Sequence, residues 1–359
     1  MAKLKIGIIG TGGVAKAHAR HYAKFPDQAE VVAGADIIPG KSAEFMREMN
    51  LPGAQAFDSA EEMLNKTKLD AVSVCTYAAT HAECAILALG HGLPVLLEKP
   101  MCVTLDEAKA IIAAEKKSGK FVTVGFQPRY DPNLRRVKEI IESGRLGKVY
   151  YIQTGGGRPR NIPGNITFLT KATAGAGSCS DAGCYPIDLA LNSIGNPKPL
   201  TVSATLSTHF GNDPKYCHLA DKLDVDDFSS AYIRLEGGIV LDYRMSWFMH
   251  MDTAGDFLFL GTEAGLKIKQ PGPIGAWDGP IGEMTIFKHD ETSSVAAGTV
   301  IPPLPSVDVW DGKIKDFIDA VASGKNIAPI PTSQIIYNQA IIDGIIRSSA
   351  LGREVACDL

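Results

Sequence analysis

Residues 4–15 read Leu-Lys-Ile-Gly-Ile-Ile-Gly-Thr-Gly-Gly-Val-Ala, and this stretch decides the fold of the first part of the chain. The apolar run at 4–9 predicts a strand, and residues 16–22 predict a helix. Between them lies the glycine spacing of a dinucleotide-binding loop, in which Gly10 permits a tight turn and Gly12 lets the backbone approach a pyrophosphate. The helix N-terminus then faces the phosphates. We therefore expect cofactor contacts at Gly10, Thr11, Gly12, Gly13 and Val14.

A second predicted strand, at residues 30–36, ends on Asp36. It lies roughly 20 residues beyond the glycines, where an acid that binds the ribose is expected. A carboxylate there accepts hydrogen bonds from a 2′-hydroxyl and repels a 2′-phosphate. Ile37 follows, also as an expected cofactor contact, and no Arg is present to bind that phosphate. This favours NAD over NADP, although Asp36 is also a residue type that begins a turn before Pro39-Gly40.

Strands and helices then alternate to about residue 125. Strands are predicted at 69–76, 94–97 and 121–125, and capping boxes at Ser59 and Thr104 begin two of the helices. This alternation is typical of an α/β doubly wound parallel sheet, which we assign to a first domain at 1–125. Thr76 and His81 follow a strand at the same edge as Gly12. For His81 we favour a structural role, fixing a turn or capping a helix, over a chemical one.

Glu98-Lys99-Pro100 follows the buried run at residues 94–97. Pro100 removes a backbone donor and biases Lys99 away from helical dihedral angles. The strand therefore ends at the lysine, on the edge where ligands bind in open α/β sheets. An isolated motif of this kind is more often a surface lysine, so the other motifs decide how Lys99 is interpreted.

After residue 125 the pattern changes to long alternating strands, which predicts a second, α+β domain at 126–359. It begins at a turn that contains Gln127, Arg129 and Tyr130, followed by a helix at 133–142. Strands at 149–154, 200–210, 228–236, 239–247 and 257–261 predict a large, mostly antiparallel sheet with one face covered by helices. The acidic segment 221–227 is interpreted as a solvated turn, and helices are expected near 311–322 and 333–349.

The overall composition is that of an ordinary globular protein. The formal net charge is −4 and no Lys/Arg run is present, which argues against nucleic acid or an anionic membrane as a partner. No apolar run approaches the roughly 18 residues needed to span a bilayer. We expect a cytoplasmic chain. Its seven cysteines are widely spaced, so we expect neither a metal site nor a disulfide framework, Cys179 and Cys184 included.

Residues 175–191 form the other informative stretch, in which small residues precede a predicted helix. Asp181 and Tyr185 are four positions apart and would project from one face. Taken alone, an acid near a helix N-terminus and a packed Tyr are the simpler interpretation.

Together, these ordered motifs resemble the Gfo/Idh/MocA family of sugar and polyol oxidoreductases. The motifs are GxGxxA, Glu-Lys-Pro, Gly-Phe-Gln-x-Arg-Tyr and Asp-x-Gly-x-Tyr-x-x-Asp. The resemblance implies a Rossmann domain, a second domain whose open sheet often forms an oligomer interface, and a homodimer or homotetramer. It also implies a catalytic set of Lys99, Asp181 and Tyr185, where Tyr185 replaces the His of most members, as in one subgroup. Further cofactor contacts are expected at Thr76, His81, Glu98, Lys99 and Gln127.

The expected reaction is hydride transfer between a nicotinamide cofactor and a secondary alcohol or ketone of a sugar, sugar acid or cyclic polyol. A free Tyr has a pKa of about 10 and needs a nearby cation to act as a base at pH 7. Tyr185 assisted by Lys99, or Lys99 itself, is therefore the expected base. Asp181 would hold a neighbouring hydroxyl, and Tyr130, Arg158 and Arg160 are candidates for the substrate rim. The alternatives are an NAD-dependent glycoside hydrolase with a transient redox step and a non-catalytic NAD-binding regulator.

Overall fold

The computed structural model describes residues 3–157, 162–251, 255–269, 282–293 and 295–359. By its internal contacts the chain divides into two units. The first comprises Met1–Gln127 and Asp308–Ile336, and the second comprises Pro128–Val307 and Tyr337–Leu359.

The first unit is built on a six-stranded parallel sheet. The chain runs outward in one direction through β1, β2 and β3, then crosses to the other side of β1 and continues through β4, β5 and β6. The strand order therefore reverses between β1 and β4, and in such sheets the carboxyl ends of these two strands form the ligand-binding edge. The strands are, in sheet order, β3 (Gln55–Phe57), β2 (Ala29–Ala35), β1 (Leu4–Ile9), β4 (Ala71–Val74), β5 (Val95–Leu97) and β6 (Val122–Val124).

Two helices of the first unit, α3 and α5, begin at the capping boxes that the sequence predicts. The Ser59 side chain accepts a hydrogen bond from Glu62 N, and Thr104 and Glu107 form a complete capping box. Each cap satisfies backbone donors that the first turn of a helix leaves without partners. The helical segments are α1 (Gly13–Tyr22), α2 (Lys41–Glu48), α3 (Ala60–Lys66), η1 (Ala78–Thr80), α4 (His81–Gly90), α5 (Leu105–Ser118) and α11 (Val309–Ser323).

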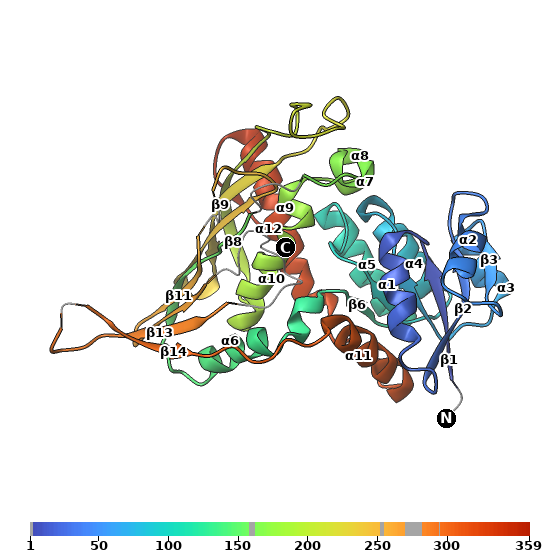
Figure 1. Cartoon of the computed structure of the whole chain (residues 1–359), viewed down its shortest axis with the longest axis horizontal. Helices are drawn as coiled ribbons and strands as arrows, with labels where there is room; N and C mark the ends of the chain where they lie inside the picture. The colour runs from blue at the N-terminus through green and yellow to red at the C-terminus, as the bar shows by residue number, and fades with distance from the viewer. Residues whose placement is uncertain (1–2, 158–161, 252–254, 270–281, 294) are drawn as a thin grey trace. The chain divides into compact units, whose positions relative to one another are not determined.

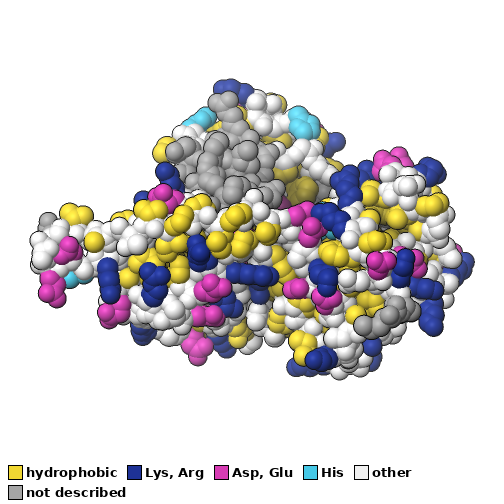
Figure 2. All heavy atoms as spheres, turned by 60° about the horizontal axis from the view of Figure 1, so that its bottom comes forward, with side chains coloured by type: hydrophobic (Ala, Val, Ile, Leu, Met, Phe, Trp, Pro, Cys, Tyr) yellow, Lys and Arg dark blue, Asp and Glu magenta, His cyan; other side chains and the backbone are white. Residues whose placement is uncertain are grey.

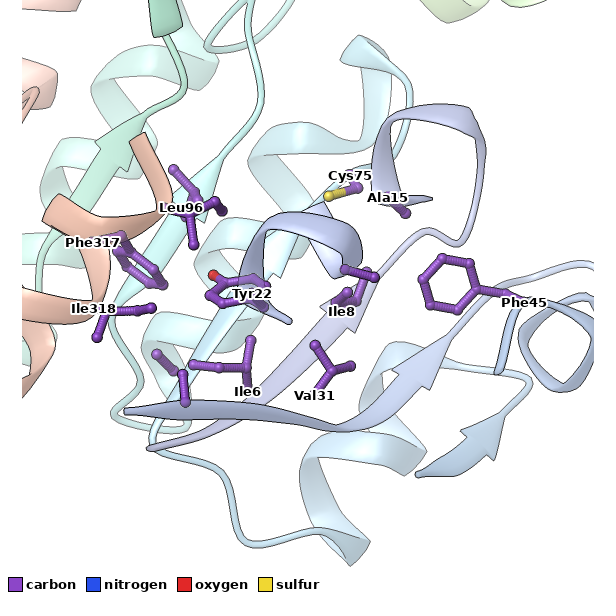
Figure 3. Close-up of a cluster of buried hydrophobic side chains, with 14 of the residues drawn as sticks. Ile6, Ile8, Ala15, Tyr22, Val31, Phe45, Cys75, Leu96, Phe317 and Ile318 are labelled. Carbon is purple, nitrogen blue, oxygen red and sulfur yellow. The ribbon is translucent and has the colours of Figure 1, made fainter. Parts of the chain in front are cut away.

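The core of the first unit includes residues from the far end of the chain. Phe317 and Ile318 of α11 pack in one buried cluster with Ile6, Tyr22 and Leu96 (Figure 3). Apolar side chains at helical spacing along α11 give it a face that is buried against α1 and the sheet. Residues 308–336 therefore group with the first unit, whereas the sequence placed everything after 125 in the second domain.

The second unit is built on a nine-stranded sheet in which every pairing is antiparallel except that of β7 with β10. In β9 the side chains alternate, with Ala231, Ile233 and Leu235 buried and Tyr232 exposed. The strands are, in sheet order, β14 (Ala297–Ile301), β13 (Met284–Lys288), β12 (Gly265–Ile268), β11 (Phe257–Gly261), β7 (Val149–Gln153), β10 (Ile239–Ser246), β9 (Phe228–Leu235), β8 (Pro199–Ser207) and β15 (Val355–Ala356).

Helices cover one face of this sheet, and no helix of the described residues lies on the other face in Figure 1. The covering helices include α9, which contacts β9 and β10, and α10, which contacts β10 and α6. The prediction of a large, mostly antiparallel sheet with one covered face is confirmed. The helical segments are η2 (Gln127–Tyr130), which begins at the last residue of the first unit, α6 (Pro132–Glu142), α7 (Ile166–Leu169), α8 (Lys171–Ala174), α9 (Ser178–Asp181), α10 (Cys184–Ser193), η3 (Glu236–Gly238) and α12 (Thr332–Leu351), which spans the unit boundary.

One interpretation of the second half was wrong. The segment 221–227 is not a wholly solvated turn, because Asp226 and Asp227 are buried. Their carboxylates accept several backbone hydrogen bonds from neighbouring loops, and this pairing makes their burial possible. The short strands β3, β12, β13, β14 and β15 were not predicted either.

Basic and acidic side chains are interspersed on the molecular face drawn in Figure 2. Such a mixed surface is ordinary for a globular protein and differs from the single-sign stripe of a nucleic-acid-binding face. Among the described residues, no helix is both long enough and apolar enough to cross a bilayer.

Candidate functional site

The glycine loop between β1 and α1 has open space above it. Gly10 has φ +82°, and a Cβ there would lie 2.8 Å from the backbone nitrogen of Thr76, so only glycine fits. A Cβ on Gly12 or Gly13 would meet nothing within 4 Å. No side chain caps the N-terminus of α1, and its first turn contains no acidic residue. Exposed helix N–H groups beside an open backbone surface fit the pyrophosphate of a dinucleotide.

Asp36 connects the end of β2 to this loop. Its Oδ2 accepts hydrogen bonds from Thr11 N and Thr11 Oγ1, both at 2.9 Å, and its Oδ1 accepts one from Ile38 N at 3.1 Å. Burial alone would raise the pKa of Asp36, but the hydrogen bonds from Thr11 and Ile38 lower it overall. Because a carboxylate offers about four acceptor positions, Oδ1 retains one that suits a ribose hydroxyl.

Two features beside Asp36 bear on the cofactor. Ile37 is 74% exposed and provides an apolar surface next to the carboxylate. Lys41 Nζ lies 3.3 Å from Asp36 Oδ2, a contact that the sequence analysis did not consider. A cation at this distance weakens the repulsion that Asp36 exerts on a 2′-phosphate.

His81 holds two strand ends together. It is 1% exposed, its Nδ1 lies 2.7 Å from the carbonyl oxygen of Pro100, and its Nε2 lies 3.1 Å from that of Thr76. Burial lowers the pKa of His81, so the ring is neutral near pH 7 and its single N–H donates to one of these two carbonyl oxygens. The contacts of His81 with the ends of β4 and β5 agree with the structural role that the sequence favoured.

Lys99 directly follows β5, at the carboxyl edge of the sheet, and is half-buried. The Lys99–Pro100 peptide bond is cis. Glu98, one residue earlier, is 4% exposed and points into the unit, where it contacts His18 of α1 and Lys313 of α11. Gln127 follows β6 at the same edge and is 6% exposed. The first unit therefore brings the glycine loop, Thr76, Lys99 and Gln127 to one edge of one sheet.

Asp181 and Tyr185 lie in the second unit, on two consecutive short helices rather than on one. Gly183 N donates to Ser178 O, five residues back, which interrupts the regular helical pattern between them. A Cβ on Gly183 would lie 1.9 Å from the Tyr243 hydroxyl and 2.4 Å from Cys179 O, so glycine is required. Both Asp181 and Tyr185 are half-buried.

The motif residues Arg129 and Asp188 form a bidentate ion pair within the second unit. Arg129 Nε donates to Asp188 Oδ2 at 2.9 Å and its terminal nitrogen donates to Oδ1 at 2.7 Å. Both side chains are largely buried, at 11% and 5% exposure. This pair fixes α10, and with it the backbone at Tyr185, to η2. It explains why the Gln-x-Arg-Tyr and Asp-x-Gly-x-Tyr-x-x-Asp motifs occur together.

The candidates for the substrate rim are only partly described. Tyr130 is 8% exposed and the Arg135 guanidinium lies 5.5 Å above its ring. Arg158 and Arg160 lie outside the described residues. The rim therefore stays a prediction.

One group among the described residues has the spacing of metal ligands, namely His21, Asp308 and Asp311. Lys24 Nζ lies 2.8 Å from the Asp308 carboxylate and 2.7 Å from that of Asp311. The ammonium of Lys24 therefore already contacts both carboxylates.

His18 and Lys313, which contact the buried Glu98 carboxylate, were not singled out from the sequence. His18 lies three residues after Ala15 and four before Tyr22, on the buried face of α1, and Lys313 interrupts the apolar face of α11. A polar residue on an otherwise apolar helix face was the available signal in both cases.

Two family models match the chain. The oxidoreductase family with an NAD-binding Rossmann fold, GFO_IDH_MocA, matches residues 4–126, and the GFO/IDH/MocA C-terminal domain matches residues 134–267.

Curated relatives match parts of the chain. Inositol 2-dehydrogenase of Pseudomonas savastanoi is 35% identical over 158 residues, which are 44% of this chain and 47% of that protein. This match therefore spans about half of the relative's length. D-glucoside 3-dehydrogenase of Escherichia coli is 28% identical over 266 residues, which are 70% of this chain and 75% of that protein.

Solved structures match the whole chain in fold. Levoglucosan dehydrogenase in complex with NADH and levoglucosan has a TM-score of 0.81 at 24% identity, covering 99% of this chain and 100% of that chain. GenD2 from gentamicin A biosynthesis in complex with NAD has a TM-score of 0.78 at 22% identity, covering 100% and 97%. At these identities the likeness shows the fold alone.

Proposed function

The chain belongs to the Gfo/Idh/MocA oxidoreductase family, and on that premise we propose that it transfers a hydride between a nicotinamide cofactor and a secondary alcohol or ketone. The proposed substrate is a sugar, a sugar acid or a cyclic polyol. The observation that carries this proposal is the position of Lys99, at the sheet edge that also holds the open glycine loop. The dehydrogenases of inositol and of a D-glucoside among the relatives support a ring-borne secondary alcohol.

The proposed cofactor is NAD, held by the glycine loop and by Asp36. Bound NAD supplies the hydride acceptor. The N–H groups at the start of α1 would bind its pyrophosphate, and the remaining acceptor position on Asp36 Oδ1 would bind a ribose hydroxyl. Ile37, Thr76, Lys99, Gln127 and the His81 turn complete the proposed contacts, and Glu98, whose side chain points into the unit, could contribute only its backbone. Because the Lys41 ammonium lies beside Asp36, any test of the cofactor has to include NADP as well as NAD.

For the proton we propose Lys99, Asp181 and Tyr185 as the catalytic set. Oxidation of an alcohol requires a base for the hydroxyl proton, and Lys99 and Tyr185 are the two candidates. Asp181 would accept a hydrogen bond from a neighbouring hydroxyl and so fix which ring carbon presents its hydrogen. Tyr130, Arg158 and Arg160 stay proposed as the substrate rim, where paired arginines would suit a carboxylate.

A substrate screen tests the function. Inositols, methyl glucosides, free sugars and sugar acids are mixed with NAD or NADP, and absorbance of the reduced nicotinamide is followed. We expect NAD reduction with at least one ring-borne secondary alcohol. Release of an aglycone without net NADH would instead indicate the glycoside hydrolase, and tight NAD binding without turnover of any compound would indicate the regulator.

Two variants separate the candidate bases. Tyr185→Phe removes the phenol and keeps the ring, and Lys99→Met removes the ammonium and keeps the chain length. If Tyr185 is the base, Tyr185→Phe lowers kcat about 10²–10⁴-fold. Near-wild-type turnover by Tyr185→Phe, together with a large loss in Lys99→Met, would assign the base to Lys99.

We also propose a cytoplasmic homodimer or homotetramer. Support comes from the uncovered face of the nine-stranded sheet, where Tyr232 is 44% exposed beside the Asp242–Arg244 ion pair. Light scattering after size-exclusion chromatography measures the oligomeric state. A monomeric wild-type protein would contradict the proposal, and a Tyr232→Asp variant is expected to weaken the assembly.

A further inference from the structure

The turn after β2 brings a cation back to the acid at the end of that strand. Lys41, the first residue of α2, has its Nζ 3.3 Å from Asp36 Oδ2. Lys41 N donates to Ile38 O at 3.1 Å, which closes the turn, and Gly40 has φ +77°, a conformation that suits glycine. A Cβ on Gly40 would meet nothing within 4 Å, so there is open space beside the turn.

The two members of this ion pair differ in how far a ligand can reach them. The Asp36 side chain is 6% exposed, whereas that of Lys41 is 36% exposed. Asp36 Oδ2 also accepts both hydrogen bonds from Thr11, at 2.9 Å each. An ammonium carries three donors, and Lys41 contacts Asp36 through one oxygen only, so it has donors left for a ligand. A ribose that enters this site therefore meets an accessible cation beside a largely covered carboxylate.

The other parts of the proposed cofactor site do not distinguish NAD from NADP. Ile37 and Ile38 are 74% and 54% exposed and offer apolar surface to an adenine, which both cofactors carry. The glycine loop faces a pyrophosphate, which both carry as well. The two cofactors differ in the group on one ribose carbon, which is a 2′-hydroxyl in NAD and a 2′-phosphate in NADP. The choice between them therefore depends on Asp36 and Lys41.

Two further acids limit how strongly this turn attracts an anion. Asp58 Oδ1 accepts a hydrogen bond from Gly40 N at 3.3 Å, and Glu44 lies in the first turn of α2. Lys41 therefore offsets the charge of Asp36 without making the surroundings strongly basic. Such a balance favours binding of both cofactors over a preference for NADP.

We propose that the chain binds NADP as well as NAD, and that Lys41 is the residue that binds the 2′-phosphate. An acid at the end of β2 excludes NADP when its charge is uncompensated, and Lys41 compensates that of Asp36. With NAD, the remaining acceptor position of Asp36 Oδ1 binds the 2′-hydroxyl. This assignment rests on the proposed function and extends its cofactor from NAD to both nicotinamide dinucleotides.

Binding is measured without any substrate, by isothermal titration calorimetry of the full-length chain with NAD and with NADP. For the wild type we expect dissociation constants within about tenfold of each other. Lys41→Met removes the ammonium and leaves Asp36 uncompensated, so NADP should bind about 10- to 100-fold more weakly. The affinity for NAD should change less than about threefold, which also shows that the variant is folded.

Two further variants serve as controls. Lys41→Arg keeps a cation that can bind a phosphate and should keep the affinity for NADP within about threefold of wild type. Lys66→Met removes the same charge from the end of α3 that precedes β4, at the opposite edge of the sheet from Asp36. The Lys66 side chain is 65% exposed and lies 2.7 Å from Glu62. This variant should leave the affinities for both cofactors unchanged.

Two results would overturn the assignment. One is a wild-type chain that binds NAD but not NADP. The other is a Lys41→Met variant that loses affinity for both cofactors equally, because Lys41 would then support the turn and not the phosphate. A chain that binds neither cofactor would contradict the proposed function itself, and this assignment with it. If both cofactors bind as expected but no compound in the substrate screen is turned over, the catalytic proposal fails and the role of Lys41 stands.

Discussion

Glu98 in the first unit and Asp226 in the second are both buried carboxylates, but they are stabilised in different ways. Glu98 has an ammonium and an imidazole as partners. Asp226 has hydrogen-bond donors from the start of α9 instead, namely Gly177 N at 2.7 Å, Ser178 Oγ at 2.7 Å and Cys179 N at 3.0 Å. The first arrangement joins distant segments through charge, and the second fixes one helix end through local hydrogen bonds.

The difference appears in how the two groups titrate. Lys313 and His18 hold the pKa of Glu98 below its ordinary range, so Glu98 stays ionised as the pH falls. Burial raises the pKa of Asp226, and its hydrogen bonds only partly oppose this. At these two deeply buried carboxylates a full opposite charge therefore outweighs desolvation, whereas the neutral donors around Asp226 do not. Glu98 therefore joins α1, β5 and α11 through charge, while Asp226 holds the start of α9, which carries Asp181.

Removing one charge of the buried pair should have the largest effect on stability. Lys313→Met leaves Glu98 ionised and uncompensated in the core, which costs about 3–5 kcal/mol. Glu98→Gln/Lys313→Met leaves a neutral amide beside His18 and should recover most of this loss. Urea unfolding followed by circular dichroism measures both free energies. A single variant as stable as wild type would show that water or a rearranged side chain compensates Glu98.

Acidification should have the next largest effect, because it protonates His18, a partner of Glu98. His18 is buried in its neutral form, with a pKa of about 4 against 6.5 in the unfolded chain. Because the unfolded state binds this proton first, the His18 contribution is complete above pH 6.5 and is lost as the pH falls toward 4. The 2.5-unit difference corresponds to about 3 kcal/mol. The free energy of unfolding is measured at pH 7, 5.5 and 4, and His18→Gln should show a shallower decline over this range; equal slopes would contradict the assignment.

Asp226→Asn tests the second arrangement and should have a smaller effect. The amide nitrogen replaces either Oδ1, which accepts from Gly177 N, or Oδ2, which accepts from Cys179 N and the Ser178 hydroxyl. In both orientations a backbone donor loses its partner, at about 1–3 kcal/mol. Since α9 carries Asp181, kcat on an identified substrate should fall as well. Asp221→Asn, on an exposed residue of the same segment, is the control and should stay within about 0.5 kcal/mol of wild type. A loss in the control as large as in Asp226→Asn would show that the segment tolerates no change.

The sequence predicted those elements that are specified by residues close together in the chain. The strand–glycine loop–helix at residues 4–22 and the capping boxes at Ser59 and Thr104 depend on neighbours within a few positions, and the structure contains them. The motif placed Lys99 at a strand end, as the structure has it, but the prediction of one helix face for Asp181 and Tyr185 was wrong, because Asp181 ends α9 and Tyr185 lies in α10. A sequence motif specifies residue types at short spacing, and that was sufficient for Lys99, for the glycine loop and for the caps.

The sequence did not predict contacts between distant segments. Glu98 and Lys313 are more than 200 positions apart, and no local pattern relates them. The same holds for α11, whose apolar face showed that it packs but not against which unit. The prediction for Asp226 was wrong because a run of acids is usually solvated, whereas the donors of Gly177, Ser178 and Cys179 make its burial tolerable.

The smallest expected effect concerns Lys315, the other lysine on α11. It tests whether the burial of an ion pair determines how much the pair contributes to the free energy of unfolding. Lys315 Nζ lies 2.5 Å from Asp319 Oδ2, so its ion pair is as short as that of Lys313, but the two side chains are 36% and 54% exposed. Exposed pairs four residues apart contribute about 0.3–0.5 kcal/mol and are screened by salt. Lys315→Met should therefore change the free energy of unfolding by no more than this in low salt, and by less in 1 M NaCl. If Lys315→Met and Lys313→Met cost the same, distance rather than burial would govern these pairs, and the contrast between the charge-balanced and the hydrogen-bonded carboxylate would lose its physical basis.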